Sequence, residues 1–482
     1  MSARARFDYE APVPALADLG RVHVLAIGGA GMSAVARLLL QAGLTVSGSD
    51  ARDSAMLAAL RADGALVWVG HDPSHLDGVD TVVVSSAIRD DNVELAAARA
   101  AGLRVLHRSQ ALAAVAGGRT PLAVAGANGK TTTTSMLTVA LQEAGLDPSF
   151  AIGGELAAAG TNARLGTGSA MVIEADESDG SFLAYKPQVA VVTNVQPDHL
   201  DFYGTFEAVQ EAYLRFTASI RPGGLLVACA DDEGSARLAE RAAADGVRVL
   251  TYGTSPGADL RLTDLRADGM TGRARLAGIG SDAELVIAVP GDHNLRNAAA
   301  AYLAATQGVL APADGVLAGL AAYTGTRRRF EPKGSAGGVH VVDDYAHNPG
   351  KVAAVVSTAR RLVEPGGRLV VVFQPHLYSR TRDFADTLAA GLAPADVAVV
   401  LDVYAAREDP MPGVSGELVA DELRALHGDT QVHYVADRAR AADAVAALVR
   451  PGDLLVTVGA GDVTDIGPAV LDLLGDGAPR SH

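Results

Sequence analysis

Residues 122–134 read Leu-Ala-Val-Ala-Gly-Ala-Asn-Gly-Lys-Thr-Thr-Thr-Thr, an apolar run followed by a turn with two glycines and a series of threonines. The apolar run predicts a short buried strand, and residues 135–141 predict the helix that follows. A strand, a glycine turn, a Lys-Thr pair and a helix together make a phosphate-binding loop. In such a loop Lys130 reaches the terminal phosphates and the hydroxyl of Thr131 holds Mg²⁺. The loop is shorter than the usual pattern, with Val124 at the first glycine position, so a plain glycine turn is the alternative.

Composition restricts the classes of protein that this chain can belong to. Its 482 residues predict about three domains, and 49% hydrophobic residues with only 4% aromatic ones favour α/β cores of Val, Ala and Leu. The single cysteine, Cys229, rules out an intrachain disulfide framework and predicts a cytoplasmic location. A formal charge of −16 disfavours nucleic-acid binding, and no apolar run predicts membrane insertion. We expect a monomer or a weak homodimer.

The N-terminal part of the chain predicts a Rossmann-like domain after a loose arm over residues 1–20. A strand over 22–27, a glycine-rich turn, a helix over 35–41 and a strand over 44–47 follow in order. The turn suits a pyrophosphate of a dinucleotide or of a UDP compound, and Asp50 suits a ribose hydroxyl. A plain βαβ turn is the alternative. Further strands are expected at 66–69, 81–85 and 103–106, with helices at 55–62 and 93–101. Candidate substrate-binding residues here are Gly29, Gly31, Met32, Ser33, Asp50, His71, Ser85 and Arg108.

Polar residues follow two predicted strands of the central part of the chain. The strand over 170–174 leads into the acidic run Glu174–Asp179, and the strand over 189–194 leads to Asp198 and His199. Parallel strands place their carboxyl ends at one edge of a sheet, here beside the phosphate loop. Carboxylates at that edge are placed to hold Mg²⁺ on ATP phosphates. A solvated acidic loop and a structural histidine are the alternatives.

Two further groups of polar residues in this part are binding candidates. Thr161 and Asn162 follow a loop rich in Gly and Ala and can contact a second substrate. Asn294 and Asn297 are three residues apart near the start of an Ala-rich helix, so both amides can face an adenine edge, with His293 beside them. Ordinary N-capping is the alternative for the two amides.

The last third of the chain predicts another Rossmann-like domain, with strands near 341–344, 369–373, 398–401 and 454–458. The segment Gly325–Phe330 is the candidate hinge, and its arginines can reach phosphates. Arg380 and Arg382 follow the strand that ends at Phe373, and two arginines there suit a small carboxylate.

With these motifs assembled, the chain resembles the Mur ligases, which form amide bonds in peptidoglycan precursors with ATP. The stretches that carry the resemblance are Gly28–Ser33, Gly126–Thr132, Glu174–Asp179, Asp198–Asp201, Asp344–His347 and Gln374–Arg380. The resemblance covers nearly the whole chain and implies an α/β fold of three domains. It implies a Rossmann-like UDP-sugar domain over residues 1–117, a P-loop ATPase-like domain over 118–325 and a Rossmann-like amino-acid domain over 326–482.

Within this family the motifs are most similar to those of members that act on UDP-N-acetylmuramate and L-alanine. The resemblance therefore implies ATP and Mg²⁺ as cofactors and a lactyl carboxylate that is phosphorylated before the alanine amine attacks it. By matching motifs it implies Thr131, Glu174 and His199 as metal ligands. It implies ATP contacts at Gly126, Asn128, Gly129, Lys130, Thr131, Thr132, His293, Asn294, Asn297, Arg328 and Asp344. It implies an alanine side formed by Tyr345, His347, Arg380 and Arg382, with Lys130, Glu174, His199, His347 and Arg380 as the catalytic residues.

The chain departs from the family pattern at three positions. Asn128 stands where the loop often has His, which leaves the role of that side chain open. Gln196 replaces a more common acid, which predicts a weaker second metal site. Tyr213 stands where related ligases carry a carbamylated lysine, so no such modification is expected.

Other functions remain open on the residues alone. A NAD-dependent oxidoreductase would use the first glycine-rich turn, but it would not need the Lys-Thr pair. A nucleotide switch would use the phosphate loop without an amino-acid substrate. A ligase that attaches a recycled tripeptide to the same UDP-sugar is a closer alternative, and folate polyglutamate ligases share the loop without the first domain.

Overall fold

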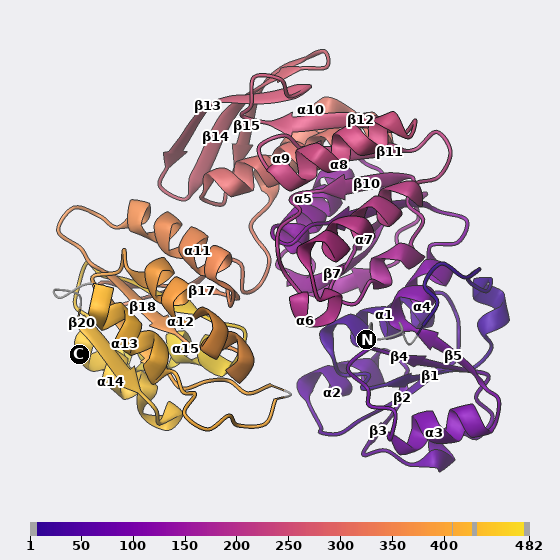
Figure 1. Ribbon diagram of the computed structural model, residues 1–482, viewed down its shortest axis with the longest axis horizontal. Helices are drawn as coiled ribbons and strands as arrows, with labels where there is room; N and C mark the ends of the chain where they lie inside the picture. Colours follow the sequence, from indigo (N-terminus) through magenta and orange to yellow (C-terminus); the bar gives the residue numbers. More distant parts are fainter. Residues whose placement is uncertain (1–6, 407, 427–430, 477–482) are drawn as a thin grey trace, which may run out of the picture. The chain divides into compact units, whose positions relative to one another are not determined.

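The strands of this protein form three sheets, and the predicted α/β class is confirmed. The structure is a computed structural model that describes residues 7–406, 408–426 and 431–476. The chain divides into two compact units, Met1–Thr324 and Gly325–His482 (Figure 1). The first unit contains a five-stranded and a ten-stranded sheet, and the second contains a six-stranded sheet. Each sheet lies within one of the three predicted domains, whose boundaries remain our proposal.

The first sheet is parallel throughout and has the order β3-β2-β1-β4-β5. The strand order reverses between β1 and β4, and ligands of such sheets bind at the carboxyl ends of the strands near this point. The strands are β1 Val22–Leu25, β2 Val46–Asp50, β3 Leu66–Val69, β4 Thr81–Val84 and β5 Arg104–His107. The helices are η1 Leu16–Leu19, α1 Ala30–Gln41, α2 Ala55–Ala62, η2 Pro73–Leu76, α3 Val93–Ala100 and α4 Arg108–Val115.

Within the ten-stranded sheet, β6, Thr120–Ala125, lies between β10 and β9 and is the strand predicted before the phosphate loop. Its side chains alternate between two cores: Leu122 and Val124 pack with α5, α9 and α10, while Ala123 and Ala125 face the core that α7 and α8 share. The parallel strands are β6, β9 Ala170–Glu174, β10 Val189–Val192, β11 Leu225–Cys229 and β12 Arg248–Gly253. The helices are α5 Lys130–Glu143, η3 Ser181–Ala184, α6 Leu200–Tyr203, α7 Phe206–Ala218, α8 Glu233–Ala244, α9 Asp292–Leu303, η4 Ala304–Gly308 and α10 Ala313–Ala322.

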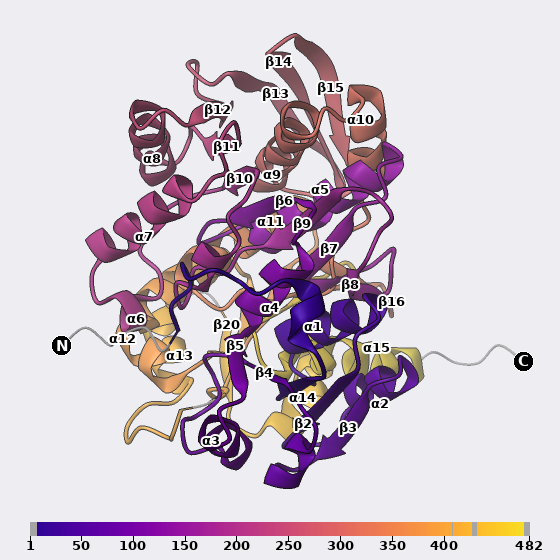
Figure 2. The same ribbon diagram turned by 90° about the vertical axis from the view of Figure 1, so that its right-hand side faces the viewer.

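Both ends of this sheet carry strands that the sequence did not predict. β13 Leu260–Asp268, β14 Thr271–Gly278 and β15 Ser281–Ile287 extend one end (Figure 2), and β7 Ser149–Leu156 pairs with β8 Thr161–Arg164 at the other. β13 and β7 are parallel to their inner neighbours, and the pairings beyond them are antiparallel. Along β13 and β15, more buried residues alternate with more exposed ones, because one face of an antiparallel extension meets water. The last three residues of β13 are all exposed.

The second unit contains a sheet of order β16-β17-β21-β18-β19-β20, with only β16 antiparallel. Its four inner strands are buried, by α11–α13 on one side and by α14 and α15 on the other, while the edge strands β16 and β20 are partly exposed. The strands are β16 Glu331–Ala336, β17 Val339–Asp344, β18 Leu369–Phe373, β19 Val397–Leu401, β20 Gln431–Val435 and β21 Leu454–Val458. The helices are α11 Pro349–Leu362, α12 Tyr378–Leu392, α13 Glu417–Leu426, η5 Arg438–Arg440, α14 Ala441–Leu448, η6 Asp462–Asp465 and α15 Ile466–Asp476.

The prediction of a loose N-terminal arm is wrong for the residues that the structure describes, which begin at residue 7. Tyr9 is buried, and its ring lies 5.2 Å from that of His107. Glu10 forms an ion pair with Arg215 of α7 at 2.5 Å. The arm therefore packs against both sheet-containing parts of the first unit. No helix in the described part of the chain combines the length and the apolar content that a membrane span requires.

Candidate active site

The phosphate loop is the turn between β6 and α5, residues Gly126 to Gly129. Gly126 and Gly129 have φ angles of 134° and 86°, which L side chains rarely adopt. A Cβ at Gly126 would lie 2.0 Å from Oγ1 of Thr193, so the loop can approach the next strand only with glycine there. The loop ends at the N-terminus of the 14-residue helix α5, which favours an anion.

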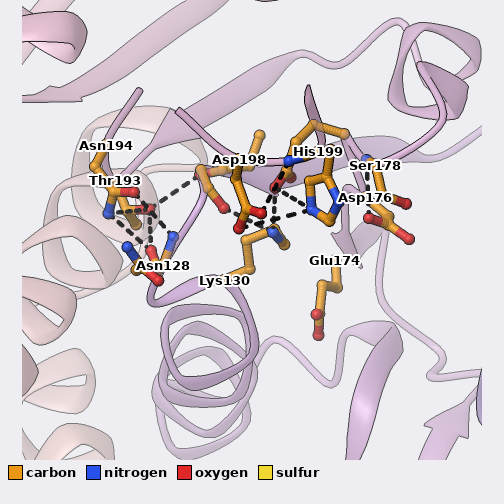
Figure 3. A network of polar contacts seen from close by, with 12 residues as sticks. Asn128, Lys130, Glu174, Asp176, Ser178, Thr193, Asn194, Asp198 and His199 are labelled. Atoms are coloured by element: carbon orange, nitrogen blue, oxygen red, sulfur yellow. Dashed lines mark hydrogen bonds and ion pairs between the residues drawn. The ribbon is translucent and has the colours of Figure 1, made fainter. Parts of the chain in front are cut away.

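The end of β10 holds this loop in place through Asn128 (Figure 3). Thr193 Oγ1 and Asn194 Nδ2 donate to the carbonyl oxygen of Asn128 at 2.6 and 2.9 Å, and Asn194 Oδ1 accepts from its backbone N–H at 2.9 Å. The side-chain amide of Asn128 donates to Gln196 Oε1 at 3.1 Å. Asn128 and Gln196 therefore shape the loop, whatever contact Asn128 makes with a nucleotide.

Lys130 is held between the loop and the acidic run that follows β9. Its Nζ atom donates to the carbonyl oxygen of Gly126 and to Oε1 of Glu177, each at 2.7 Å. Burial alone lowers the pKa of Lys130, but the negative charge of Glu177, reinforced by Asp176 and Glu174, outweighs burial and raises it. Lys130 therefore stays charged, and one of its three N–H donors remains for a further acceptor.

Glu174 and Thr131 form the second contact between the acidic run and the loop. Thr131 Oγ1 donates to Glu174 Oε1 at 2.9 Å, and Oε2 accepts from the N–H of Gly153 at 2.7 Å. A hydroxyl and a carboxylate at a phosphate loop are the hard oxygen ligands that Mg²⁺ prefers. The sequence predicted that Glu174 would lie beside the phosphate loop at the carboxyl ends of the strands, and its contact with Thr131 agrees. Their role as metal ligands remains a proposal.

His199 lies apart from Glu174 (Figure 3). Its Nε2 atom is 3.7 Å from Oε1 of Glu177 and 3.8 Å from Oδ2 of Asp198, and its φ angle of 54° is left-handed. Among the described residues, no three His, Cys, Asp or Glu side chains are grouped as a metal cage. The protein by itself therefore offers a partial metal site, which phosphate oxygens would complete.

The Asn pair of α9 borders the same loop. Asn297 Nδ2 donates to Asn294 Oδ1 at 3.3 Å, and Asn294 Nδ2 donates to the carbonyl oxygen of Pro290 at 2.7 Å. A Cβ at Gly129 would lie 2.7 Å from Asn297 Oδ1, so Asn297 touches the loop directly. Ordinary N-capping does not account for these amides, because the N-cap residue of α9 is Gly291. His293, next to Asn294, is exposed.

In the first sheet, the glycine-rich turn lies at the N-terminus of α1. Asp50 Oδ2 accepts from the N–H of Gly28 at 3.0 Å, so its carboxylate closes this turn. Met32 and Ser33 are buried and serve the packing of α1, with Ser33 Oγ donating to the carbonyl oxygen of Ala30 at 3.0 Å. Gly29 and Gly31 lie at this N-terminus, and a Cβ at Gly31 would lie 3.0 Å from Nη1 of Arg108.

The candidate His71 has partners that the sequence did not indicate, and His75, which was not a candidate, shares them. The Nδ1 atoms of His71 and His75 lie 2.7 Å from the two carboxylate oxygens of Glu94, a fully buried side chain at the start of α3. Ser49 Oγ also donates to Glu94, at 2.5 Å. No pattern in the sequence marks this cluster, because its members come from separate segments.

At the end of β4 the polar contact falls on Ser86 and not on the predicted Ser85. Ser86 Oγ donates to Asp179 of the acidic run and lies 3.2 Å from Nε2 of His107. Arg108 Nη2 donates to Asp176 Oδ2 at 2.7 Å. The first sheet thus contacts the acidic run at two carboxylates.

Thr161 and Asn162 of β8 lie against α1. Asn162 Nδ2 donates to the carbonyl oxygen of Ala30 at 2.8 Å, and its Oδ1 accepts from Arg37 at 3.0 Å. Arg37 also lies 3.4 Å from Thr161 Oγ1. The structure therefore brings both candidates to the start of α1, beside the glycine-rich turn.

In the second unit, Arg328 and Asp344 are held by backbone groups. Arg328 Nη2 donates to the carbonyl oxygens of Gly459 and Gly461 at 2.7 and 2.9 Å. Its guanidinium carbon is 4.8 Å from the centre of the Tyr345 ring. Asp344 is buried and accepts from the N–H groups of Phe330 and Ala346, each at 2.8 Å.

A cluster of rings and one arginine lies at the carboxyl ends of β17 and β18. His376 Nδ1 is 3.2 Å from Nη1 of Arg380, and the rings of His376 and His347 are 5.5 Å apart. Burial lowers the pKa of His347 well below its usual value, and its Nδ1 atom is 2.9 Å from the carbonyl oxygen of Tyr345. Arg382 is not part of this cluster, because its Nε atom pairs with the exposed Asp383 at 2.7 Å. His376, which the candidate residues omit, lies at its centre.

Comparison with known proteins covers nearly the whole chain. Three family models match in order: "Mur ligase family, catalytic domain" over residues 21–120, "Mur ligase middle domain" over 124–305 and "Mur ligase, glutamate ligase domain" over 328–461. A UDP-N-acetylmuramate–L-alanine ligase of Kineococcus radiotolerans is 58% identical over 97% of this chain and 98% of its own length. Its namesake from Mycolicibacterium gilvum is 54% identical over 94% of this chain and 96% of its own.

Solved structures give the same picture. The UDP-N-acetylmuramate-alanine ligase MurC of Thermotoga maritima is 28% identical with a TM-score of 0.79, over 94% of this chain and 98% of that one. A murein peptide ligase of Psychrobacter arcticus is 25% identical with a TM-score of 0.68, over 95% of this chain and 99% of that one.

Proposed function

This chain belongs to the Mur ligase family, and we propose that it joins L-alanine to the lactyl carboxylate of UDP-N-acetylmuramate. ATP is the phosphoryl donor, and the products are UDP-N-acetylmuramoyl-L-alanine, ADP and phosphate, a step of peptidoglycan precursor synthesis. Relatives of this activity are 50–58% identical over nearly the whole chain. The observation that carries the proposal is the paired contact of Lys130 with Glu177 and of Thr131 with Glu174 at the phosphate loop.

The reaction needs an activated acid, because a carboxylate oxygen is a poor leaving group for an attacking amine. Phosphorylation of that oxygen allows it to leave as phosphate. We propose that Lys130 offers its remaining N–H donor to the transferring phosphoryl group, whose charge it stabilises in the transition state. The carbonyl oxygen of Gly126 and Oε1 of Glu177 accept hydrogen bonds from the other two N–H groups of Lys130 and so fix the direction of the third.

The residues beside the phosphate loop fit Mg²⁺. Mg²⁺ is usually bound by one or two carboxylates together with substrate phosphates and waters, and Glu174 with Thr131 supplies such a pair. We propose these two residues as ligands, with His199 as a third. When bound, the ion supplies positive charge that offsets the charge of the phosphate oxygens.

The remaining ATP contacts are proposed from their positions around the loop and in the second unit. Asn294 and Asn297 border the loop, and the exposed His293 lies next to them. Arg328 and Asp344 belong to the second unit, where backbone groups hold both side chains. For the sugar nucleotide, we propose the N-terminus of α1 together with Arg108, Thr161 and Asn162 as the anion-binding surface.

The cluster in the second unit suits an amino acid. The guanidinium of Arg380 can bind a carboxylate through two parallel hydrogen bonds. Because His347 is neutral and its Nδ1 atom faces the carbonyl oxygen of Tyr345, its Nε2 atom has a lone pair for an amine. We propose that L-alanine binds between these groups.

An acyl-enzyme route finds little support in the chain. Its one cysteine, Cys229, ends the buried strand β11, and burial raises the pKa of its thiol. A thiol that stays protonated is a poor nucleophile.

The substrates are cytoplasmic precursors in this proposal, which agrees with the location expected from the cysteine content.

The test is a phosphate-release assay with ATP, Mg²⁺, UDP-N-acetylmuramate and one amine at a time: L-alanine, glycine, L-serine or the stem tripeptide. We expect release that depends on both UDP-N-acetylmuramate and L-alanine. Lys130→Ala should lower the rate by about 10²–10³ while UDP-N-acetylmuramate still binds. Lys186→Ala, which removes an exposed lysine of the same unit, is the matched control. Release with the tripeptide alone would instead assign the recycling activity.

A further inference from the structure

The acidic run Glu174–Asp179 contacts two different parts of the first unit in alternation. Glu174 and Glu177 contact Thr131 and Lys130 of the phosphate loop. Asp176 contacts Arg108 of α4, at 2.7 Å. Asp179 contacts Ser86, and its Oδ2 atom lies 3.4 Å from Nε2 of His107. One short segment therefore touches both the proposed ATP loop and the sheet proposed for the sugar nucleotide.

Arg108 extends this connection to the glycine-rich turn. While Nη2 donates to Asp176, Nη1 lies 3.0 Å from the point that a Cβ on Gly31 would occupy. Gly31 is in the first turn of α1, where the helix N-terminus favours a pyrophosphate. The Arg108 side chain is 23% exposed, so the surrounding protein holds it in this position. A guanidinium has five N–H donors in a fixed fork and can serve two anions together.

We propose that Arg108 and Asp176 act as positioning residues that couple the binding of the sugar nucleotide to the binding of ATP. The inference rests on the proposed function, since it takes the pyrophosphate of UDP-N-acetylmuramate as the anion at α1. That anion holds Arg108 from one side, and Arg108 holds Asp176 and the acidic run from the other. Glu174 and Glu177 are then already ordered when ATP arrives, so the second ligand loses less conformational entropy.

The coupling has a defined sign and is reciprocal. Each ligand should lower the dissociation constant of the other by the same factor, because both binding orders lead to the same complex. A factor of roughly 5 to 150 is typical of such coupling. This coupling runs through Arg108 and the acidic run, apart from the contact between the γ-phosphate and the lactyl carboxylate that the reaction itself requires.

The experiment is isothermal titration calorimetry of the full chain with a β,γ-imido analogue of ATP and Mg²⁺, with and without saturating UDP-N-acetylmuramate. The ratio of the two dissociation constants measures the coupling. Titration in the reverse order should give the same ratio. Asp176→Asn removes the charge that pairs with Arg108 and keeps the shape of the side chain, so we expect its ratio to fall toward one.

Glu10→Gln is the matched control. Glu10 pairs with Arg215 at 2.5 Å, which also joins the N-terminal arm to the central part, but neither residue contacts the acidic run. Its ratio should equal that of the unaltered protein. A ratio of one in the unaltered protein, or an unchanged ratio in Asp176→Asn, would overturn the coupling. The proposed function would survive either result if each ligand still binds alone.

A second variant and a second measurement cover the case in which Asp176→Asn binds neither ligand. Arg108→Lys keeps one positive charge but not the fork, so its ratio should also fall. Hydrogen exchange of residues 175–181 should slow in the unaltered protein on addition of UDP-N-acetylmuramate alone, and should not slow in Arg108→Lys. If both variants lose the binding of each ligand alone, the pair is merely structural and the proposal is wrong.

Discussion

At the scale of single residues, Arg380 and Arg382 show how tertiary contacts separate two similar side chains. Both follow β18 and both are arginines, yet only Arg380 lies beside His376, whose ring lies 5.5 Å from that of the half-buried His347. Arg382 pairs with Asp383 on the surface of α12. The structure therefore favours Arg380 as the carboxylate-binding residue.

Arg380→Lys should raise KM for L-alanine about 10- to 100-fold, because an ammonium cannot copy two parallel hydrogen bonds to a carboxylate. KM for ATP and for UDP-N-acetylmuramate should change little. Initial-rate kinetics with each substrate varied in turn are the measurement. Arg360→Lys, at an exposed ion pair with Asp396, is the control. A raised alanine KM in Arg382→Lys but not in Arg380→Lys would move the carboxylate to Arg382.

Glu94 gives a second residue-scale prediction, on stability against pH. Burial raises the pKa of Glu94, but the nearby His23 ring, whose Nε2 atom lies 3.6 Å from Oε1, and hydrogen bonds with Ser49, His71 and His75 outweigh burial and lower it to about 2 from 4.5. A carboxyl whose pKa is lower in the folded than in the unfolded state stabilises the fold above pH 4.5. That contribution is lost as pH falls toward 2.

Glu94→Gln should lower the free energy of unfolding at pH 7 by about 3 kcal/mol, which corresponds to the shift of its pKa. The difference between the two proteins should shrink below pH 4.5, where the carboxyl of the unfolded chain becomes neutral while that of the folded chain stays charged. Urea unfolding at pH 7, 4 and 3, followed by circular dichroism, measures it. A difference that is constant over this range would show that lost packing and not charge is responsible.

At the scale of elements, the two ends of α5 carry glycines with similar backbone angles and different surroundings. Gly129 has φ 86° and a neighbour at 2.7 Å from its potential Cβ, the Oδ1 atom of Asn297. Gly145, after the C-terminus, has φ 80° and nothing within 4 Å. A comparison of substitutions at Gly129 and Gly145 therefore distinguishes the effect of backbone strain from the effect of crowding in the phosphate loop.

Gly129→Ala and Gly145→Ala should each destabilise the fold by about 1–2 kcal/mol through left-handed strain. Only Gly129→Ala should also weaken binding of the ATP analogue, because its methyl group displaces Asn297 or the loop. Thermal unfolding and calorimetric titration of both variants test this. Equal ATP affinity in the two variants would remove Asn297 and Gly129 from the binding surface.

The ends of β9 and β10 give the prediction for the metal. Glu174→Ala and His199→Ala should each raise the Mg²⁺ concentration needed for half-maximal rate, because loss of a ligand weakens binding of the ion. Rates measured over a range of Mg²⁺ at saturating ATP give this concentration. A fall by one common factor at all Mg²⁺ concentrations would exclude the altered residue as a ligand. The control is Asp147→Ala, a loop carboxylate that binds Thr167 and Arg164.

At the scale of the whole molecule, our proposal assigns activation of the acid to one compact unit and binding of the amino acid to the other. The phosphate loop and the acidic run lie in the first unit, and the Arg380 cluster lies in the second. The division between Thr324 and Gly325 coincides with the start of the segment that the sequence marks as a hinge. We expect the acid to be activated as an acyl phosphate before the amine attacks.

Heavy oxygen in the lactyl carboxylate tests this order of events. In an acyl-phosphate route, one carboxylate oxygen leaves with the phosphoryl group, so the released phosphate should carry one labelled oxygen. Mass spectrometry of the phosphate and of the nucleotide is the measurement. Label in AMP, or in neither product, would contradict the route.

By itself, the sequence determined the α/β class, the order of the motifs and the positions of β3, β9, β18 and β21, whose predicted bounds agree with the structure. β9, β18 and β21 are largely buried, and a short apolar run bounded by turn residues predicts such a strand. β3 is a partly exposed edge strand that is apolar in sequence all the same. The strands β13–β15 were missed, because charged and polar residues alternate with the apolar ones in them, so they lack the continuous apolar runs from which the other strands were predicted.

Only the tertiary structure decided which polar residues meet. The sequence placed Glu174, Asp176, Glu177 and Asp179 in one acidic run, but their partners come from α5, α4 and the end of β4. It likewise gave no sign that His376 would lie beside His347 or that Glu94 would hold two histidines. Spacing along the chain fixes which strand edge a residue reaches, whereas the direction of a side chain depends on packing with segments far away in sequence.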